Sequence, residues 1–227
     1  MTRPLLDREL QKLQDRLLAL GSEVEQNLVS AVNTLINRDD AGSRRIIAQD
    51  QHINEEHMSI EKDSLILIAR QQPMATDLRF IASVIAIATE LERMNDYAKG
   101  IAKINLMIGD EPLLETVELL PRMAEKAGSM LQRALQAFVD NDVEAAYAIH
   151  EEDDEVDALY NRAYEQLVAL ITSNSSTMDQ ATHLLWAAHN LERTADRVSN
   201  ICERVIFTAT GQIVEMPEES EIAYPQE

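Results

Sequence analysis

The sequence is poor in the residues that cross-link, bend or interrupt a chain. Its 227 residues include one cysteine, six glycines, six prolines and only 4% aromatic residues. The single Cys202 excludes an internal disulfide bond, as is usual in a reducing cytosol. Because glycine and proline are the main interrupters of helices, a chain with so few of them and 45% hydrophobic residues is expected to form long helices.

Long hydrophobic runs are also missing. No apolar stretch approaches the roughly 20 residues that span a bilayer, and residues 1–7 lack the hydrophobic segment of a signal peptide. We therefore expect a cytoplasmic protein that does not insert into a membrane. It would reach the inner face of the membrane only through partner proteins.

Positive charge is scarce. Lys and Arg number 20 against 40 Asp and Glu, which gives a formal net charge of −20 at pH 7. Such a surface repels nucleic acids and anionic lipid headgroups, so neither is expected as a ligand. Bound cations or basic protein surfaces would complement this charge, and the need for solubility is an equally good explanation of it.

Hydrophobic periodicity and the few interrupters predict six helices. The expected ranges are 5–37, 43–71, 77–108, 122–140, 143–171 and 178–210. The first range carries leucines at alternating spacings of four and three, the seam of helices packed at a shallow angle, and Gly21 within it is only mildly unfavourable. Thr76 and Thr177 are the expected N-caps of the third and sixth helices.

The breakers Gly109, Pro112 and Pro121 indicate a linker over residues 109–121. It divides the chain into two three-helix units, 1–108 and 122–210. The remaining acidic tail, 211–227, has no Lys or Arg and is expected to be largely disordered. The predicted architecture is all-α, with six long helices forming two similar antiparallel three-helix bundles.

The two units repeat the same acidic motifs. Residues 91–96 and 191–196 share the pattern LER-x-x-D, one hundred positions apart. Residues 50–54 (DQHIN) resemble residues 153–157 (DDEVD). Each unit therefore holds two pairs of polar side chains at a spacing of four, which places both members of a pair on one helix face.

Counting from the turns predicts that these pairs meet. Asp50 and Asp96 are equidistant from residue 73, in the predicted turn, and so are Asn54 and Glu92. The same symmetry holds around residues 174 and 175 in the second unit. Residues equidistant from the turn of an antiparallel helix hairpin lie at the same height. We expect a first acidic cluster of Asp50, Asn54, Glu92 and Asp96, and a second acidic cluster of Asp153, Asp157, Glu192 and Asp196.

Clustered carboxylates repel one another unless some are protonated or a cation neutralises them. Ligands that are all oxygen favour Mg, Ca, Mn or Fe over Zn or Cu. The two clusters are therefore candidate metal sites, and Asn54 predicts weaker or lower occupancy in the first. With 40 acidic residues in the chain, acid pairs at this spacing are also common on solvated faces, so structural or partner-facing carboxylates stay open as the alternative.

Several side chains near the clusters are expected to pack, to form hydrogen bonds or to pair with the acids, and not to bind metal. His57, Glu61, Tyr160, Tyr164 and His189 extend the faces of the clusters and are interpreted as packing or hydrogen-bonding residues. The arginines at 79, 93, 193 and 197 either pair with the acids or face solvent. Cys202 is interpreted as a small core residue and Trp186 as a packing anchor.

At these residues the chain resembles the PhoU family of bacterial phosphate-uptake regulators. The resemblance rests on the repeated LER-x-x-D, on DQHIN and DDEVD, and on residues 72–79 and 200–206, and it covers about residues 5–212. It implies a negative regulator of phosphate uptake and of the phosphate-starvation response, the Pho regulon. It also implies a homodimer whose partners are the ATPase subunit of the phosphate ABC transporter and a membrane sensor histidine kinase.

The resemblance also bears on the metal. Family members carry E/D-x-x-x-D motifs that hold multinuclear metal clusters, with iron in some cases. Carried over position by position, the ligands would be the eight residues of the two acidic clusters, with Asn54 departing from the acidic pattern.

Two other classes of function use helical bundles of this kind. Di-iron enzymes and iron-storage bundles use a Glu-x-x-His motif, and none of the five histidines has Glu three residues before it. A carboxylate-bridged iron-binding bundle nevertheless remains the alternative to the regulator. A phosphotransfer bundle would need an exposed histidine, whereas His57 and His189 are expected on buried or clustered faces. No glycine-rich phosphate loop exists, so we expect a protein that is not an enzyme.

Overall fold

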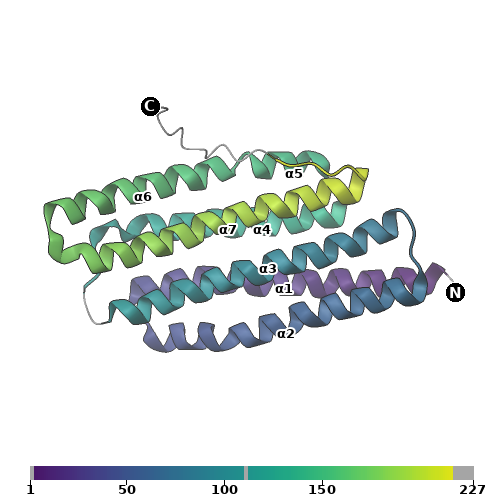
Figure 1. Cartoon of the computed structure of the whole chain (residues 1–227), viewed down its shortest axis with the longest axis horizontal. Helices are drawn as coiled ribbons and strands as arrows, with labels where there is room; N and C mark the ends of the chain where they lie inside the picture. Colours follow the sequence, from purple (N-terminus) through teal and green to yellow (C-terminus); the bar gives the residue numbers. More distant parts are fainter. Residues whose placement is uncertain (1–2, 110–111, 217–227) are drawn as a thin grey trace, which may run out of the picture.

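A computed structural model describes residues 3–109 and 112–216, and every regular element in these residues is helical (Figure 1). The elements are α1 (Arg3–Asn37), α2 (Asp40–Gln71), α3 (Thr76–Ile108), the 3₁₀ helix η1 (Glu115–Glu118), α4 (Leu119–Asp140), α5 (Val143–His150), α6 (Asp153–Ser173), the 3₁₀ helix η2 (Ser175–Thr177) and α7 (Met178–Thr210). None of the helices in the described residues combines the length and the hydropathy of a membrane-spanning segment.

The helices form two antiparallel three-helix units that lie side by side, as predicted (Figure 1). In the first unit α1 and α2 pack on α3, and in the second α4, α5 and α6 pack on α7. Helices α5 and α6 follow one another and together take the place of one long helix. The units join where α3 lies along α7 and α1 lies along α4.

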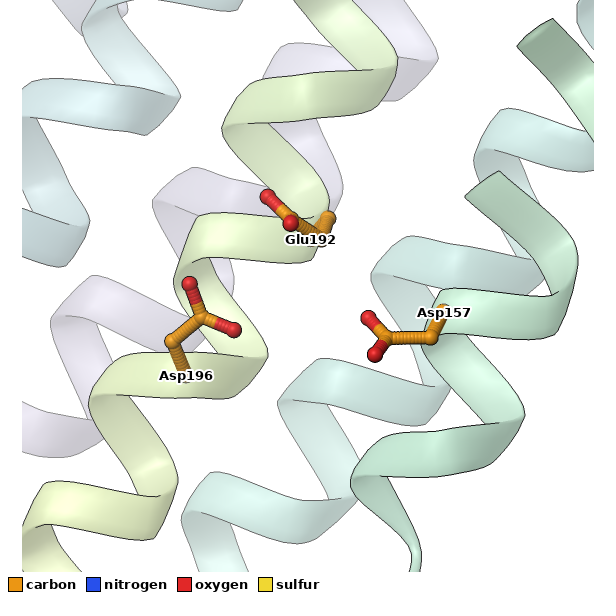
Figure 2. Close-up of side chains that lie close together, drawn as sticks. All are labelled: Asp157, Glu192 and Asp196. Carbon is orange, nitrogen blue, oxygen red and sulfur yellow. The ribbon is translucent and has the colours of Figure 1, made fainter. Parts of the chain in front are cut away.

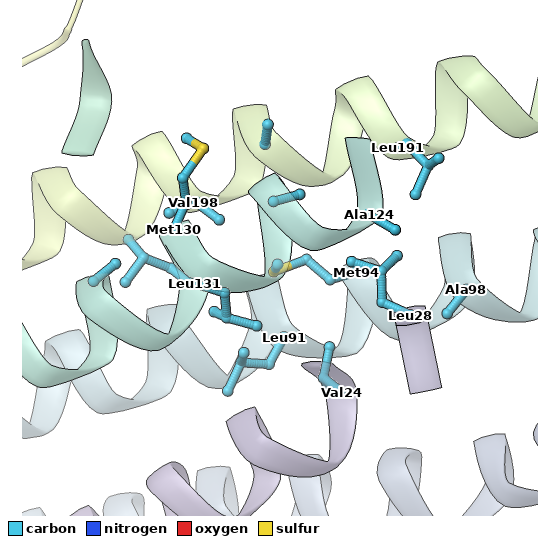
Figure 3. Close-up of a cluster of buried hydrophobic side chains, with 14 of the residues drawn as sticks. Val24, Leu28, Leu91, Met94, Ala98, Ala124, Met130, Leu131, Leu191 and Val198 are labelled. Atoms are coloured by element: carbon cyan, nitrogen blue, oxygen red, sulfur yellow. The ribbon is translucent and has the colours of Figure 1, made fainter. Parts of the chain in front are cut away.

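The core is continuous across the two units. Leu28 of α1, Leu91 and Met94 of α3, Leu131 of α4 and Leu191 of α7 are all fully buried within one hydrophobic cluster (Figure 3). Each such side chain contributes roughly 1.5–3 kcal/mol by its removal from water. The leucine seam predicted for α1 supplies part of this core.

Gly21 has a structural role that the sequence does not indicate. It lies where α1 approaches α4, and a Cβ added there would come 2.2 Å from Leu135 Cδ1. The missing side chain therefore allows the two helices to approach closely.

Two predicted helix starts are wrong for local reasons. α2 begins at Asp40 rather than residue 43, because the Asp39 carboxylate accepts a hydrogen bond from Gly42 N at 2.8 Å and caps the helix early. Thr76 is the first residue of α3 and not its N-cap. Thr177 is the N-cap residue of α7, as predicted, although its hydroxyl donates to Asn174 O at 2.7 Å and makes no capping hydrogen bond to the helix.

The linker is shorter than predicted. Residues 115–118 form η1, and α4 begins at Leu119 rather than at residue 122. Pro121 therefore lies inside α4, in its first turn, where a backbone N–H would have no helical partner to lose.

The predicted fifth helix is interrupted at Glu151 and Glu152. Glu152 N donates to Ile149 O at 3.1 Å, a tightened turn in place of a regular helical bond, and α6 starts afresh at Asp153. Its first turn holds Asp153, Asp154 and Glu155, which complement the positive end of the helix dipole.

The segment after α7 is ordered where the structure describes it. Met216 is buried, and its backbone N–H donates to Glu203 Oε1 at 2.9 Å. Met216 thereby adds to the core, whereas residues 211–213 are exposed. Residues 217–227 of the predicted tail lie outside the described residues.

Candidate metal centre

The hairpin of α6 and α7 brings three carboxylates together. Asp157 projects from α6 toward Glu192 and Asp196, which lie one turn apart on α7 (Figure 2). One oxygen from each of the three lies within 4.8 Å of the others, and all three side chains are half-buried. This is the meeting of helix faces that counting from the turn predicts.

Asp153, the fourth member of the second acidic cluster, lies one turn before Asp157. Its Oδ2 accepts a hydrogen bond from the Ser199 hydroxyl at 3.3 Å. Its Oδ1 is buried and accepts no hydrogen bond from any residue that the structure describes. Burial, with added repulsion from Asp196 and Asp157, raises the pKa of Asp153 to about 7.

His189 borders the second cluster on α7. Its Nδ1 lies 3.0 Å from Glu192 Oε2, and its ring centroid lies 6.0 Å from that of Tyr160. Burial lowers the pKa of His189, which favours the neutral imidazole. Tyr160 also contacts Tyr164, at 6.5 Å between centroids.

The first acidic cluster is assembled differently. Asp50 on α2 and Asp96 on α3 flank the ammonium group of Lys99, whose Nζ lies 2.5 Å from Asp50 Oδ2 and 3.2 Å from Asp96 Oδ1. Asn54 Nδ2 also donates to Asp50 Oδ2, at 3.3 Å. Burial and the neighbouring Asp96 raise the pKa of Glu92.

Lys99 lies within the first acidic cluster but is not among the residues that the acidic motifs predict. It follows Asp96 by three positions on α3, a spacing that places both side chains on one helix face. The signal was therefore available. Within residues 3–109 and 112–216, the three acids of the first acidic cluster do not bring their carboxylate oxygens close enough together to hold one ion.

The arginines near the clusters mostly join helices to one another. Arg197 of α7 lies 3.4 Å from Glu90 of α3, and the Arg193 guanidinium lies 4.7 Å from the ring centroid of Tyr97, also on α3. Arg93 also pairs with Glu90, at 3.5 Å. The contacts of Arg197 and Arg193 link the two units, whereas the pair of Arg93 and Glu90 lies within α3.

Of the other side chains singled out in the sequence, some have the predicted roles and Trp186 does not. His57 Nε2 lies 3.3 Å from Thr89 Oγ1, consistent with a hydrogen-bonding role, and Arg79 Nε donates to Thr208 O at 3.3 Å. Cys202 is fully buried, which confirms it as a core residue. The interpretation of Trp186 as a packing anchor is wrong. Its side chain is 54% exposed on the outer face of α7, edge-on to His183.

Comparison with known proteins gives the family. The model of the PhoU domain matches residues 17–104 and again residues 120–205. This chain belongs to the PhoU family. The two matches coincide with the two three-helix units, which confirms the internal duplication.

Relatives match the chain over nearly its full length. A phosphate-specific transport system accessory protein PhoU homolog of Clostridium acetobutylicum is 34% identical over 95% of this chain and 99% of its own. One from Streptococcus pneumoniae serotype 4 is 33% identical over 92% of this chain and 97% of its own. The PhoU family is one of regulatory proteins that are not enzymes, as expected for this chain.

Solved PhoU structures share the fold. The phosphate transport system regulatory protein PhoU from Streptococcus pneumoniae superposes with a TM-score of 0.87 at 32% identity, over 93% of this chain and all of that one. PhoU from Pseudomonas aeruginosa gives a TM-score of 0.85 at 30% identity, over 91% of this chain and 99% of that one.

The second acidic cluster fits a metal ion and the first fits poorly. In the second, three half-buried carboxylates converge and a buried Asp153 oxygen lacks a hydrogen-bond donor among the described residues. Oxygen ligands of this kind suit hard or borderline cations such as Mg, Ca, Mn or Fe. In the first, an ammonium group already lies between two of the acids.

Proposed function

We propose that this chain is an accessory protein of a phosphate-specific transport system that acts as a negative regulator of phosphate uptake and of the phosphate-starvation response. The supporting observation is the match of both PhoU repeats, over nearly the whole chain, to accessory and regulatory proteins of phosphate transport systems. Its partners are the ATPase subunit of the phosphate ABC transporter and a membrane sensor histidine kinase, which it joins from the cytoplasmic side as a homodimer.

The shape and charge of the body suit an adaptor. A bundle with one continuous core presents rigid outer helix faces, and a net charge of −20 attracts basic surfaces on partners. Such a body regulates by binding one state of a partner more tightly than the other. When the transporter is saturated with phosphate, the adaptor then biases the kinase toward its inactive state.

Deletion of the gene tests the regulatory role. We expect alkaline phosphatase output to rise in phosphate-rich medium, and the wild-type chain supplied in trans to restore repression. Unchanged phosphatase output after deletion would contradict the regulator.

A metal ion is the second element of the proposal. Asp157, Glu192 and Asp196 would hold it, with Asp153 beside them. An ion held there would supply positive charge between α6 and α7, where the carboxylates of the two helices converge. Bound there, it would relieve carboxylate repulsion and fix the register of the hairpin.

Metal analysis of the purified full-length protein tests this site. We expect Glu192→Ala combined with Asp196→Ala to remove most of the bound metal. Glu165→Ala combined with Asp179→Ala is the matched control, because it removes two exposed acids from the same two helices. Equal metal content in both double variants would remove the assignment.

A further inference from the structure

The two PhoU repeats differ at the positions that surround their acidic clusters. On the third helix of each unit, Asn95 and Lys99 correspond to Ala195 and Ser199, one hundred positions later. On the second helix, Asn54 corresponds to Asp157, as Asp50 does to Asp153. An ammonium group and two amides in the first unit are thus replaced by a hydroxyl, a methyl group and a carboxylate in the second.

Lys99 occupies the centre of the first cluster. Its Nζ contacts one carboxylate from each helix of the hairpin, Asp50 on α2 and Asp96 on α3. The Lys99 side chain is 23% exposed and that of Asp50 only 9%, so the pair is largely shielded from water. Bridging acidic groups of two helices is the task that a metal ion would perform there.

The amides complete the same arrangement. Asn95 Nδ2 donates to Asp50 Oδ1 at 3.0 Å. Asn27 of α1 donates to Asn95 Oδ1 at 2.9 Å, which fixes the Asn95 amide with its nitrogen toward Asp50. With Asn54 and Lys99 donating to Oδ2, both oxygens of Asp50 have donors. A metal ion would have to displace this set of donors and then lie beside the Lys99 ammonium.

The second unit has a serine where the first has Lys99. Ser199, at the position equivalent to Lys99, donates to Asp153 Oδ2 and lies 3.0 Å from His150 Nδ1. A hydroxyl can satisfy one oxygen but brings no positive charge. The cluster that converges without an ammonium at this position is also the one whose carboxylate oxygens approach closely enough to hold an ion.

We propose that Lys99 is the resident cation of the first PhoU repeat, where its ammonium takes the place of a metal ion and prevents one from binding. Lys99 then holds α2 and α3 together at any metal concentration. Only the contact between α6 and α7 depends on a bound metal ion. The claim about the second hairpin rests on the proposed metal site, whereas the claim about Lys99 does not.

Mn²⁺ binding by the full chain tests this division. In the Glu192→Ala, Asp196→Ala background, which removes the second site, we expect no Mn²⁺ to bind. Adding Lys99→Ser and Asn54→Asp to that background gives the first repeat the residues of the second at two of the three differing positions. We expect it to gain about one equivalent of Mn²⁺, measured by calorimetry and elemental analysis. Lys99→Arg with Asn54→Asp is the matched control, because it keeps the positive charge and should gain none.

Different failures point to different claims. Mn²⁺ binding by the Glu192→Ala, Asp196→Ala protein that is lost with Asp96→Ala would overturn the role of Lys99. So would a folded Lys99→Ser, Asn54→Asp protein that gains no Mn²⁺. If the unaltered chain binds none but the converted repeat does, the second site is wrong and the role of Lys99 stands.

Hydrogen exchange gives a readout that needs no variant. In the unaltered chain, Mn²⁺ should slow amide exchange around residues 153–157 and 192–196, relative to a sample with chelator. Exchange around residues 50–54 and 92–99 should not change. A slowing in the first hairpin equal to that in the second would contradict the proposal.

Discussion

Asp50 and Asp153 occupy equivalent positions in the two repeats. The neighbours of the Asp50 carboxylate are hydrogen-bond donors, whereas those of the Asp153 carboxylate include other acids. Asp50 accepts hydrogen bonds from an ammonium and two amides. Asp153 is buried beside Asp196 and Asp157, and its pKa is raised to about 7. In protein free of metal, the ionised form of Asp153 therefore weakens the folded state.

The consequence can be measured as a function of pH. The pKa of Asp153 lies above its ordinary 3.8, so the destabilisation is absent below about pH 4, grows toward pH 7 and is complete above it. In protein treated with a chelator, Asp153→Asn should raise the Tm at pH 8 and leave it nearly unchanged at pH 4. Asp154→Asn, on an exposed neighbour, is the control. A rise of equal size at both pH values would contradict this account.

Cys202 gives a second prediction at this scale. Its side chain is fully buried in α7, and burial raises the pKa of its thiol to about 12. The thiolate is the reactive form of cysteine, so it should react with a thiol reagent at pH 8 only after unfolding. We expect the native protein to stay unlabelled and the protein in guanidinium to take up one label per chain. Rapid labelling of the native protein would show that this part of the core opens readily.

At the scale of elements, the break between α5 and α6 is held by Glu152. Arg133 of α4 donates to both carboxylate oxygens of Glu152 at 2.6 Å, and Lys126 Nζ, also on α4, lies 2.7 Å from Glu152 Oε2. These contacts fix the start of α6 against α4. The hydrogen bonds from Arg133, with help from Lys126, lower the pKa of Glu152 to about 2.

Stability from these contacts should follow the charge of Glu152. A pKa lowered from 4.5 to about 2 means that the contribution is complete above about pH 4.5 and is lost as the pH falls toward 2. Glu152→Gln should therefore lower the Tm at pH 7, with a difference from the wild type that shrinks below pH 4.5 and vanishes near pH 2. Glu151→Gln, at the exposed neighbouring position, should change the Tm little at either pH.

The sequence predicts the elements well and their ends poorly. Leucine periodicity and turn residues locate the long helices. The reason is that each helix buries one face in the core, and the residues of that face recur at the helical period. The break at Glu151 and Glu152 is not predicted, because the apolar periodicity continues through it. The run of five acidic residues, 151–155, was a usable sign of a helix start. Burial of Met216 depends on tertiary contacts that local composition does not encode.

The acidic clusters show the same limit. Symmetry about the turns predicts that Asp157 and Glu192 meet, because helix geometry fixes height along a hairpin. What neutralises each cluster depends on which further side chains turn inward. Lys99 and Asn95 do so in the first unit, and a rule based on acidic motifs alone overlooks them. Trp186 illustrates the converse, since hydrophobicity alone does not tell which helix face is left uncovered.

At the scale of the whole molecule, the two repeats behave as parts of one folded body. The hydrophobic cluster runs through α1, α3, α4 and α7 without a gap. Polar contacts reinforce the same seam, where Arg197 meets Glu90 and Arg193 covers Tyr97. A unit separated from its partner would expose the buried faces of these helices to water. We therefore expect the two repeats to unfold together and not as independent folding units.

Thermal unfolding should reveal this unity. Leu91 lies in the first repeat and is fully buried beside residues of both repeats (Figure 3). Leu91→Ala should cost about 2–5 kcal/mol and shift one calorimetric transition to lower temperature as a whole. Leu65→Ala, at a residue that is 54% exposed, should leave the transition nearly in place. Two separate transitions, of which only the first moves with Leu91→Ala, would mean that each repeat is stable without the other and that the shared core contributes little to either.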